Sequence, residues 1–290
     1  MGYRWRTLAT PPRGTPGFTS LLPNRTGVTF TNTVRDSLIL ANRILVQGGG
    51  VALGDVDQDG LVDVYLCRTD GPNALYRNRG DWRFEDITTA AGVAARDRYS
   101  TGATLADIDG DGDLDLLVLA LGGPNAWFIN DGTGRFTEQQ LPDRAGSTTA
   151  ALADVDRDGD LDVFIANYKA YTTLDSLPPQ VRAFDQLARE IAPRRFEILP
   201  QYTRDYRVVP REDLRGVSIV QRADPDFFYL YQGGVFERIP FVSDRFRDEE
   251  GKPLSYEPES FGLAAMFADV DRDGDPDLYI ANDFEDPDEF

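Results

Sequence analysis

The sequence predicts an all-β fold made of repeated four-stranded antiparallel units, and three observations carry this prediction. A nine-residue acidic motif occurs four times, with aspartate at positions one, three, five and nine and glycine at position six. Each copy is followed by a short apolar run rich in β-branched and aromatic residues, which is typical of a buried strand. The first two copies begin 52 residues apart, and several turn residues recur at the same interval.

The acidic motifs have the composition of a metal-binding loop. Four carboxylates within nine residues repel one another when they are packed into one turn. A hard divalent cation removes this repulsion, and calcium takes about six to eight oxygen ligands in tolerant geometry. Glycine at position six permits the sharp bend because it has no Cβ. The pattern therefore predicts a cation at the centre of each loop.

The expected ligands are the side chains at positions one, three, five and nine and the backbone carbonyl at position seven. Calcium is favoured, with up to four ions, because magnesium demands stricter octahedral geometry and fewer carboxylates; manganese stays open. The candidate metal ligands are Asp55, Asp57, Asp59, Leu61, Asp63, Asp107, Asp109, Asp111, Asp113, Asp115, Asp154, Asp156, Asp158, Asp160, Asp162, Asp269, Asp271, Asp273, Asp275 and Asp277.

The residues around the motifs exclude an EF-hand and favour a hairpin. An EF-hand needs flanking helices and a glutamate at position twelve, but position twelve is apolar here: Leu66, Val118, Ile165 and Ile280. A small residue precedes each motif: Gly54, Ala106, Ala153 and Ala268. Each loop is therefore expected to join a narrow strand to a buried strand.

The repeat extends beyond the loops and indicates a β-propeller. Gly71-Pro72-Asn73 returns as Gly123-Pro124-Asn125, and Phe84 returns as Phe136. Four antiparallel strands at a period near fifty residues are typical of a propeller blade, and blades must stack to bury both faces. The predicted units are 48–95, 96–145, 146–245 and 258–290.

The ends of the chain suggest a partial propeller. Residues 1–17 are expected to be a tail. Residues 18–34 parallel the segment that starts at Phe84, which predicts the outer strand of a preceding blade. Residues 18–290 would then be about three and a half blades of a longer protein, and the open blade faces predict chain–chain association.

An insertion at 168–222 interrupts the third unit and differs in composition. Residues 168–224 contain ten basic and eight acidic residues, a net charge of +2 against −19 for the whole chain. A helix is predicted to begin at Ser176-Leu177-Pro178-Pro179 and to end at Pro193. Two roles stay open: a recognition surface over one propeller face, or a structural flap whose arginines pair with the acidic propeller.

Composition excludes several classes of function. The net charge of −19 argues against nucleic acid as a partner. The chain has no histidine, which removes Ser-His and Cys-His nucleophiles and His-ligated zinc. Its only cysteine, Cys67, lies in a predicted buried strand and is interpreted as an inert core residue. No apolar run reaches the length of a membrane span, and no signal-peptide core is visible.

The residues also resemble a known family. The segment from Gly49 to Gly60 is similar to the FG-GAP or VCBS repeat of integrin-α-type propellers. The segments 26–30 and 281–284 resemble, more narrowly, bacterial relatives of cartilage acidic protein, which often carry an ASPIC/UnbV module. The resemblance implies a seven-bladed calcium-binding propeller that is exported, extracellular or periplasmic, and engaged in recognition. It places the ligands on the aspartates named above.

Two classes of function follow. The leading hypothesis is a non-enzymatic binding or adhesion scaffold with structural calcium, whose partner is a protein or a carbohydrate. The alternative is a glycan-acting enzyme, a lyase or hydrolase built on a propeller. Its candidate acids outside the loops are Asp205, Glu212 and Asp213 in the insertion, because paired carboxylates can cleave glycosidic bonds.

Overall fold

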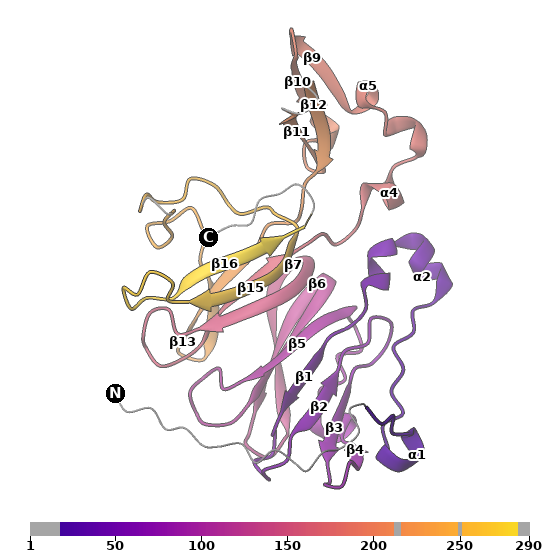
Figure 1. The fold of residues 1–290 in the computed structure, drawn as a ribbon, viewed down its shortest axis with the longest axis vertical. Coiled ribbons are helices and arrows are strands. Elements are labelled where there is room, and N and C mark those ends of the chain that lie inside the picture. The colour runs from indigo at the N-terminus through magenta and orange to yellow at the C-terminus, as the bar shows by residue number, and fades with distance from the viewer. Residues whose placement is uncertain (1–17, 212–215, 249–250, 284–290) are drawn as a thin grey trace.

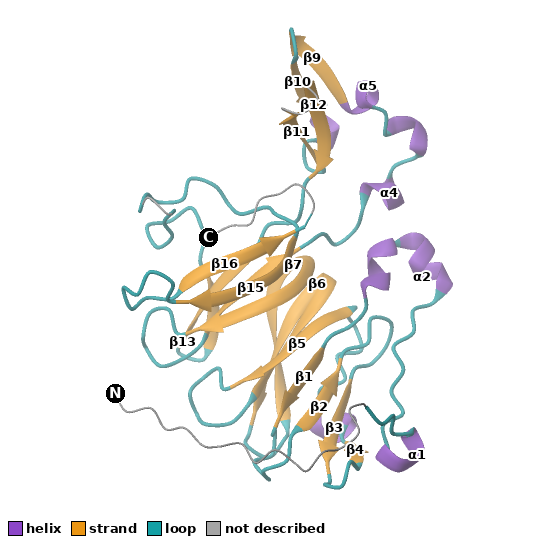
Figure 2. Cartoon of the chain, viewed as in Figure 1, coloured by secondary structure: helices purple, strands orange, loops and turns teal. Residues whose placement is uncertain are grey.

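The structure is a computed structural model that describes residues 18–211, 216–248 and 251–283. Strands dominate it (Figure 2). In chain order the elements are α1 (Pro23–Thr26), α2 (Asp36–Ala41), η1 (Arg43–Gln47), β1 (Val51–Gly54), β2 (Asp63–Leu66), β3 (Ala74–Asn78), β4 (Phe84–Asp86), α3 (Thr88–Ala91), β5 (Ser100–Ala106), β6 (Asp115–Asn130), β7 (Phe136–Ala153), β8 (Asp162–Asn167), α4 (Thr173–Ser176), η2 (Pro179–Val181), α5 (Phe184–Leu187), β9 (Ala188–Ala192), β10 (Arg195–Ile198), η3 (Pro200–Tyr202), β11 (Tyr206–Arg211), β12 (Gly216–Gln221), β13 (Phe227–Gln232), β14 (Val235–Arg238), β15 (Gly262–Ala268) and β16 (Asp277–Asn282).

The strands form antiparallel sheets that fan out along the molecule (Figure 1). The first sheet has the order β1-β2-β3-β4, and β15 pairs with β16 at the other end. Between them lies a sheet of order β5-β6-β7-β8-β13-β14. Strand β7 links two units in this sheet, because its first half pairs with β6 and its second half pairs with β8. The all-β, propeller-like prediction is confirmed, and the described strands form no closed barrel.

The four acidic motifs occupy equivalent places in this architecture. Each one connects two antiparallel strands, and the residue before the first aspartate is paired with the aspartate at position nine. The pairs are Gly54 with Asp63, Ala106 with Asp115, Ala153 with Asp162, and Ala268 with Asp277. The hairpin prediction therefore holds for all four motifs, in one common register.

The core lies between the sheets, which explains the continuous apolar runs. Leu116 and Val118 of β6 pack in one cluster with residues of the first sheet, whereas Leu117 and Leu119 pack on the opposite side. Strand β8 does the same, with alternate residues in two clusters. A strand that is buried on both faces needs apolar residues at every position. The sequence therefore lacks the usual polar alternation in these runs.

Small residues let the innermost strands approach one another. A Cβ on Gly54 would lie 2.6 Å from Cδ1 of Leu114, and a Cβ on Gly50 would lie 2.9 Å from Cα of Gly102. The contact at Gly50 is with backbone, so glycine is needed there, whereas the end of the Leu114 side chain could move to admit the alanine that the other units carry in place of Gly54. These contacts support the prediction that the strand before each loop is narrow.

Buried amides tie each unit to the next at the end of the strands away from the loops. Asn73, in the Gly-Pro-Asn turn, donates to Oγ of Ser100 at 2.9 Å. Its equivalent, Asn125, donates to Oγ of Ser147 at 3.0 Å. All four side chains are buried. Because an unpaired buried amide is costly, these bonds fix how successive sheets are placed.

Residues 18–34 do not form the predicted outer strand. The segment contains α1 and has no strand. The parallel with the segment after Phe84 holds for the helix, since α1 and α3 both end at a left-handed glycine, Gly27 and Gly92. The segment lies beside β4, an edge strand, since a Cβ on Gly27 would be 2.4 Å from the backbone oxygen of Phe84, yet it forms no strand pairing there. The predicted tail, residues 1–17, lies outside the described residues.

The insertion also differs from its prediction. Instead of one long helix it contains α4, η2 and α5, followed by the hairpins β9–β10 and β11–β12. Residues Ala188–Ala192 turn back on Arg195–Ile198, with Arg194 in the left-handed region at φ 63°. Cross-strand pairing thus overrides the helical periodicity. Figure 1 shows the hairpins standing beyond the sheets rather than lying across them.

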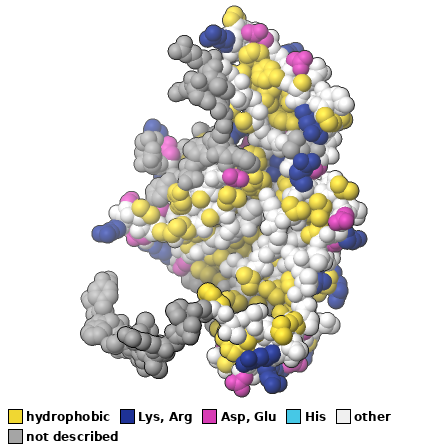
Figure 3. Space-filling view, turned by 45° about the vertical axis from the view of Figure 1, so that its right-hand side comes forward, with side chains coloured by type: hydrophobic (Ala, Val, Ile, Leu, Met, Phe, Trp, Pro, Cys, Tyr) yellow, Lys and Arg dark blue, Asp and Glu magenta, His cyan; other side chains and the backbone are white. Residues whose placement is uncertain are grey.

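The end sheets leave apolar side chains exposed. Val51 and Leu53 of β1, and Leu263 and Met266 of β15, are all more than half exposed. Figure 3 shows apolar side chains open to solvent over the middle of the molecule, below the insertion. The longest helix among the described residues has six residues, so no described helix is long and apolar enough to cross a membrane.

Candidate metal centre

The four loops share a local hydrogen-bond pattern that turns their carboxylates inward. In the first and third loops the aspartate at position one accepts from the backbone at positions five and six, as Asp55 does from Asp59 at 3.1 Å and from Gly60 at 2.7 Å. The aspartate at position five accepts from the backbone at position seven in every loop. Glycine at position six has a positive φ in each copy, between 87° and 104°. This backbone requirement explains why the motif needs glycine there.

At least three carboxylates converge in each loop. Ligand oxygens lie within 4.8 Å of one another in four groups: Asp55, Asp57 and Asp63; Asp107, Asp109 and Asp111; Asp154, Asp156 and Asp162; Asp269, Asp271 and Asp273. All twelve of these aspartates are among the candidate ligands, with positions one, three and nine in the first and third groups and positions one, three and five in the other two. That the five candidate ligands of each loop bind a single ion stays a prediction.

Several oxygens in the first two loops fit a cation. Oδ1 of Asp57, Oδ1 of Asp107 and Oδ1 of Asp113 are buried and accept no hydrogen bond among the described residues. Buried carboxylate oxygens without a partner are unfavourable. A calcium ion would satisfy them, since it prefers several carboxylate and carbonyl oxygens. The donor set of these loops therefore suits a hard divalent cation.

The aspartate at position nine has a second role that the sequence did not reveal. Oδ2 of Asp162 accepts from the backbone of Val155 at 2.9 Å, and Oδ1 accepts from the backbone of Tyr231 at 2.9 Å. Asp63 and Asp115 make the same two kinds of bond, to the loop and to the third strand of the unit. This carboxylate therefore fastens the loop to its sheet.

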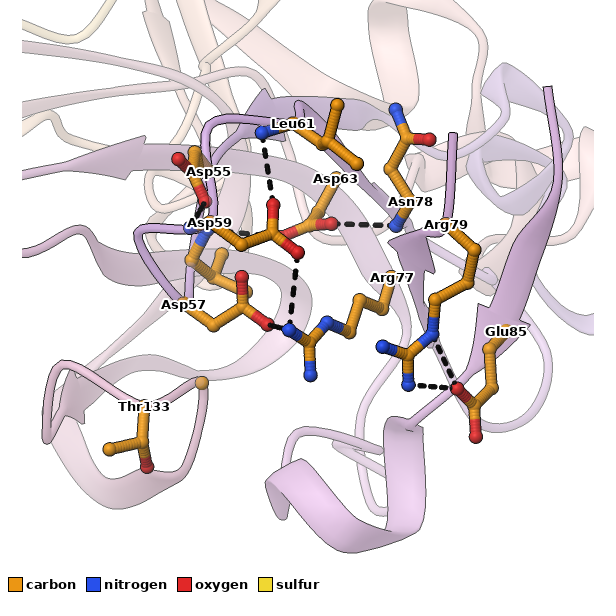
Figure 4. A network of polar contacts seen from close by, with 12 residues as sticks. Asp55, Asp57, Asp59, Leu61, Asp63, Arg77, Asn78, Arg79, Glu85 and Thr133 are labelled. Carbon is orange, nitrogen blue, oxygen red and sulfur yellow. Dashed lines mark hydrogen bonds and ion pairs between the residues drawn. The ribbon is translucent and has the colours of Figure 1, made fainter. Parts of the chain in front are cut away.

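An arginine contacts the acids of the first loop. Arg77 forms ion pairs with Asp57 and, at 3.1 Å, with Asp59 (Figure 4). The residue after Arg77 is Asn78, whose backbone N–H donates to Asp63. The same bond in the other units identifies the positions that are equivalent to Arg77. The positions equivalent to Arg77 are Ile129 and Leu230. A charged residue at an otherwise apolar position was the sequence signal that could have identified this contact.

The second loop carries the strongest uncompensated negative charge. Burial, followed by the neighbouring loop carboxylates, raises the pKa of Asp113 to about 6. Burial also raises the pKa of Asp115 to about 7. In contrast, a backbone hydrogen bond from Leu61 and the contact with Arg77 lower the pKa of Asp59 in the first loop. The second loop therefore has the most to gain from a bound cation.

The loops are joined in a row along one side of the sheets. The amide of Asn130 donates to the carbonyl of Val56 at 2.9 Å, which ties the second unit to the first loop. The backbone of Leu161 donates to Ile108 at 2.8 Å, joining the third loop to the second. Arg157 of the third loop donates to the carbonyl of Gly274 in the fourth at 2.6 Å. A change at one loop therefore reaches its neighbour directly.

The acids named for the enzyme alternative do not form a described catalytic pair. Asp205 accepts from the hydroxyl of Tyr171 at 3.2 Å and lies 3.9 Å from Nζ of Lys169. These contacts fasten the base of the insertion. Glu212 and Asp213 lie outside the described residues.

The raised pKa values of Asp113 and Asp115 predict an unusual pH dependence. An acid whose folded-state pKa is raised stabilises the fold below its unfolded-state pKa, and this contribution is lost as the pH rises through the folded-state value. For Asp115 alone the difference between about pH 5.5 and pH 7.5 is about 2 kcal/mol. We expect chelator-treated protein to melt at a higher temperature at the lower pH. Calcium-saturated protein, the control, should not show this gain, and a lower melting point in acid would contradict the assignment.

Comparisons with known proteins agree with this geometry. Residues 55–118 and 107–165, which include the first three loops, match the FG-GAP-like repeat. The chain thus contains FG-GAP-like repeats of the kind that the loops and sheets define. It is similar to cartilage acidic protein 1 of Xenopus tropicalis, with 30% identity over 112 residues, 36% of this chain and 17% of that protein. It is also similar to cartilage acidic protein 1 of Homo sapiens, with 33% identity over 86 residues, 30% of this chain and 13% of that protein. The matches span less than a fifth of these relatives.

Proposed function

We propose that these units form part of a calcium-binding propeller that acts outside the cell as a non-enzymatic binding scaffold. The main observation in its support is that three carboxylates converge in each of four hairpin loops, and that the four hairpins share one strand register. The FG-GAP-like repeats and the similarity to cartilage acidic protein 1 support the scaffold and the extracellular setting. The partner is a protein or a carbohydrate, and exposed apolar residues of β1 and β15 support association of further sheets or chains.

Calcium in this proposal is structural. The loops lie at strand ends, and in each of them the carboxylates at positions five and nine accept hydrogen bonds from the backbone of the loop. Such engagement orients oxygens around a shared centre and holds the hairpin closed. A bound ion would neutralise the charge repulsion and stabilise the row of loops. The calcium ions would thereby fix the strands that display a recognition surface.

Calcium titration of chelator-stripped protein, followed by calorimetry, tests the proposal. We expect saturable binding, with the tightest site in the second loop, where burial and crowded carboxylates raise the pKa of Asp113 and Asp115. The same protein should leave a panel of neutral and acidic polysaccharides uncleaved. Absence of calcium binding would end the metal proposal, and turnover of any polysaccharide would favour the enzyme alternative.

Replacing Arg77 tests how the first loop differs from the others. In Arg77→Leu, the cation that contacts Asp57 and Asp59 is replaced by the kind of residue found at Leu230. We expect the weakest calcium site, that of the first loop, to bind calcium about ten-fold more tightly, because the competing charge of Arg77 is lost. Arg79→Leu is the matched control, since Arg79 pairs with Glu85 instead. Equal changes in the two variants would show that only net charge matters.

A further inference from the structure

A cavity of about 600 Å³ lies where the insertion joins the sheets. Its walls come from Asp143 and Arg144 in β7, from residues 203–204 after η3, from residues 222–225 and Phe227 around the start of β13, and from Arg238 and Glu259. Strand β8 begins at a metal loop and ends at Asn167, where the insertion starts. The cavity therefore lies at the opposite end of the strands from the loops. Its volume is within the usual range for ligand pockets, about 300–1,000 Å³.

Two of the four arginines that line the cavity are neutralised, and two are not. Arg222 pairs with Glu259 at 2.6 Å, and Arg238 pairs with Asp143 at 2.9 Å. Arg144 and Arg204 are exposed, and their guanidinium groups make no ion pair or hydrogen bond with any residue that the structure describes. The two free cations come from segments sixty residues apart and line one cavity.

We propose that this cavity binds an anionic saccharide, a sugar unit that carries a carboxylate or a sulfate. Arg144 and Arg204 would hold the anionic group, because guanidinium groups form strong two-point hydrogen bonds with such oxyanions. The chain has a net charge of −19, so long-range attraction does not collect anions on it. Recognition here must come from local contacts. The inference names a ligand class for the scaffold and rests on that proposed function.

The cavity walls favour a saccharide over a peptide. Most of the residues that line them are charged or polar, and the one aromatic ring among the described lining residues, Phe227, is covered by the guanidinium of Arg238 at 4.7 Å from its centroid. Peptides bind mainly through apolar and aromatic anchors in dry pockets. Sugar hydroxyls both donate and accept hydrogen bonds, so they suit walls that contain carboxylates beside guanidinium groups.

The carboxylate of Asp224 is held in place to receive such hydroxyls. Its Oδ2 accepts from the backbone of Gly146 at 2.9 Å and from the backbone of Ala170 at 2.8 Å. These bonds also fix the root of the insertion against β7. Because Arg144 belongs to the sheet and Arg204 to the insertion, a ligand that contacts both arginines would bridge the two parts.

Calorimetric titration of the full chain in calcium tests this inference. The probes are a galacturonic acid trisaccharide, a sulfated disaccharide, a neutral trisaccharide and a glutamate tripeptide. We expect an acidic saccharide to bind about ten-fold or more tightly than the neutral sugar and the peptide. The carboxylated and sulfated probes distinguish the two kinds of anion. In Arg144→Gln/Arg204→Gln, this binding should weaken about ten-fold or more.

The matched control is Arg194→Gln/Arg245→Gln, which removes the same charge from exposed positions outside the cavity. It should bind the acidic saccharide as the unaltered chain does. The inference is overturned if the neutral sugar or the peptide binds equally well, or if both double variants behave alike. Calcium-dependent melting of the same samples, together with analysis of the saccharide for cleavage, reports separately on the proposed scaffold function.

Discussion

Removal of calcium should lower the melting temperature by about 10 °C or more. An ion that binds only the folded state stabilises it by about 2.7 kcal/mol when its concentration is a hundred times the dissociation constant, and several loops contribute. Chelation also restores the repulsion among converging carboxylates, which is greatest in the second loop. Thermal unfolding followed by circular dichroism, with and without EGTA, measures the effect.

The control for chelation is reversal by excess calcium. Magnesium should restore less of the stability because it accepts these crowded carboxylate ligands poorly, and manganese is a separate arm that tests metal preference. A melting curve that is the same with and without EGTA would show that the loops hold their shape without an ion. The structural role proposed for calcium would then be wrong.

Asp162→Ala should be among the most damaging single substitutions in the chain. It removes the two bonds from the backbone N–H groups of Val155 and Tyr231 to a fully buried carboxylate. Each buried donor left without a partner costs about 1–3 kcal/mol. We expect the melting temperature to fall by about 5–10 °C, in calcium and in EGTA.

Asp158→Ala is the matched control in the same loop. Asp158 is exposed, and its carboxylate accepts a bond from the backbone of Asp160 only within the loop. Its loss should weaken calcium binding but have little effect on melting in EGTA. If the two variants melt alike under both conditions, Asp162 acts only as a metal ligand and does not fasten the loop to the sheet.

The loops could be predicted from the sequence because their information is local. Ten consecutive residues contain the small residue before the loop, the carboxylates and the glycine that bends the chain. The burial of the apolar runs that follow could also be predicted from the sequence, because a strand packed on both faces has no polar positions. The register of all four hairpins follows from these two patterns.

The insertion shows the limit of such reasoning. Val181, Phe184, Ala188 and Ile191 fit a helical spacing, yet Ala188 and Ile191 lie in β9. The pairing of β9 with β10 was not visible in the periodicity, since it depends on how two neighbouring segments meet. The strand predicted at 18–34 is absent, because a local likeness to another segment does not decide whether the backbone pairs with a neighbouring sheet edge.

By itself, the sequence determined the repeat, the all-β class and the loops in which acids converge, because each depends on residues close together in the chain. Only the tertiary structure decided that Arg77 contacts the first loop and that position-nine aspartates fasten loop to sheet. It also decided that Arg144 and Arg204 line one cavity. These contacts join residues that are far apart in sequence, and their placement depends on how the sheets pack against one another.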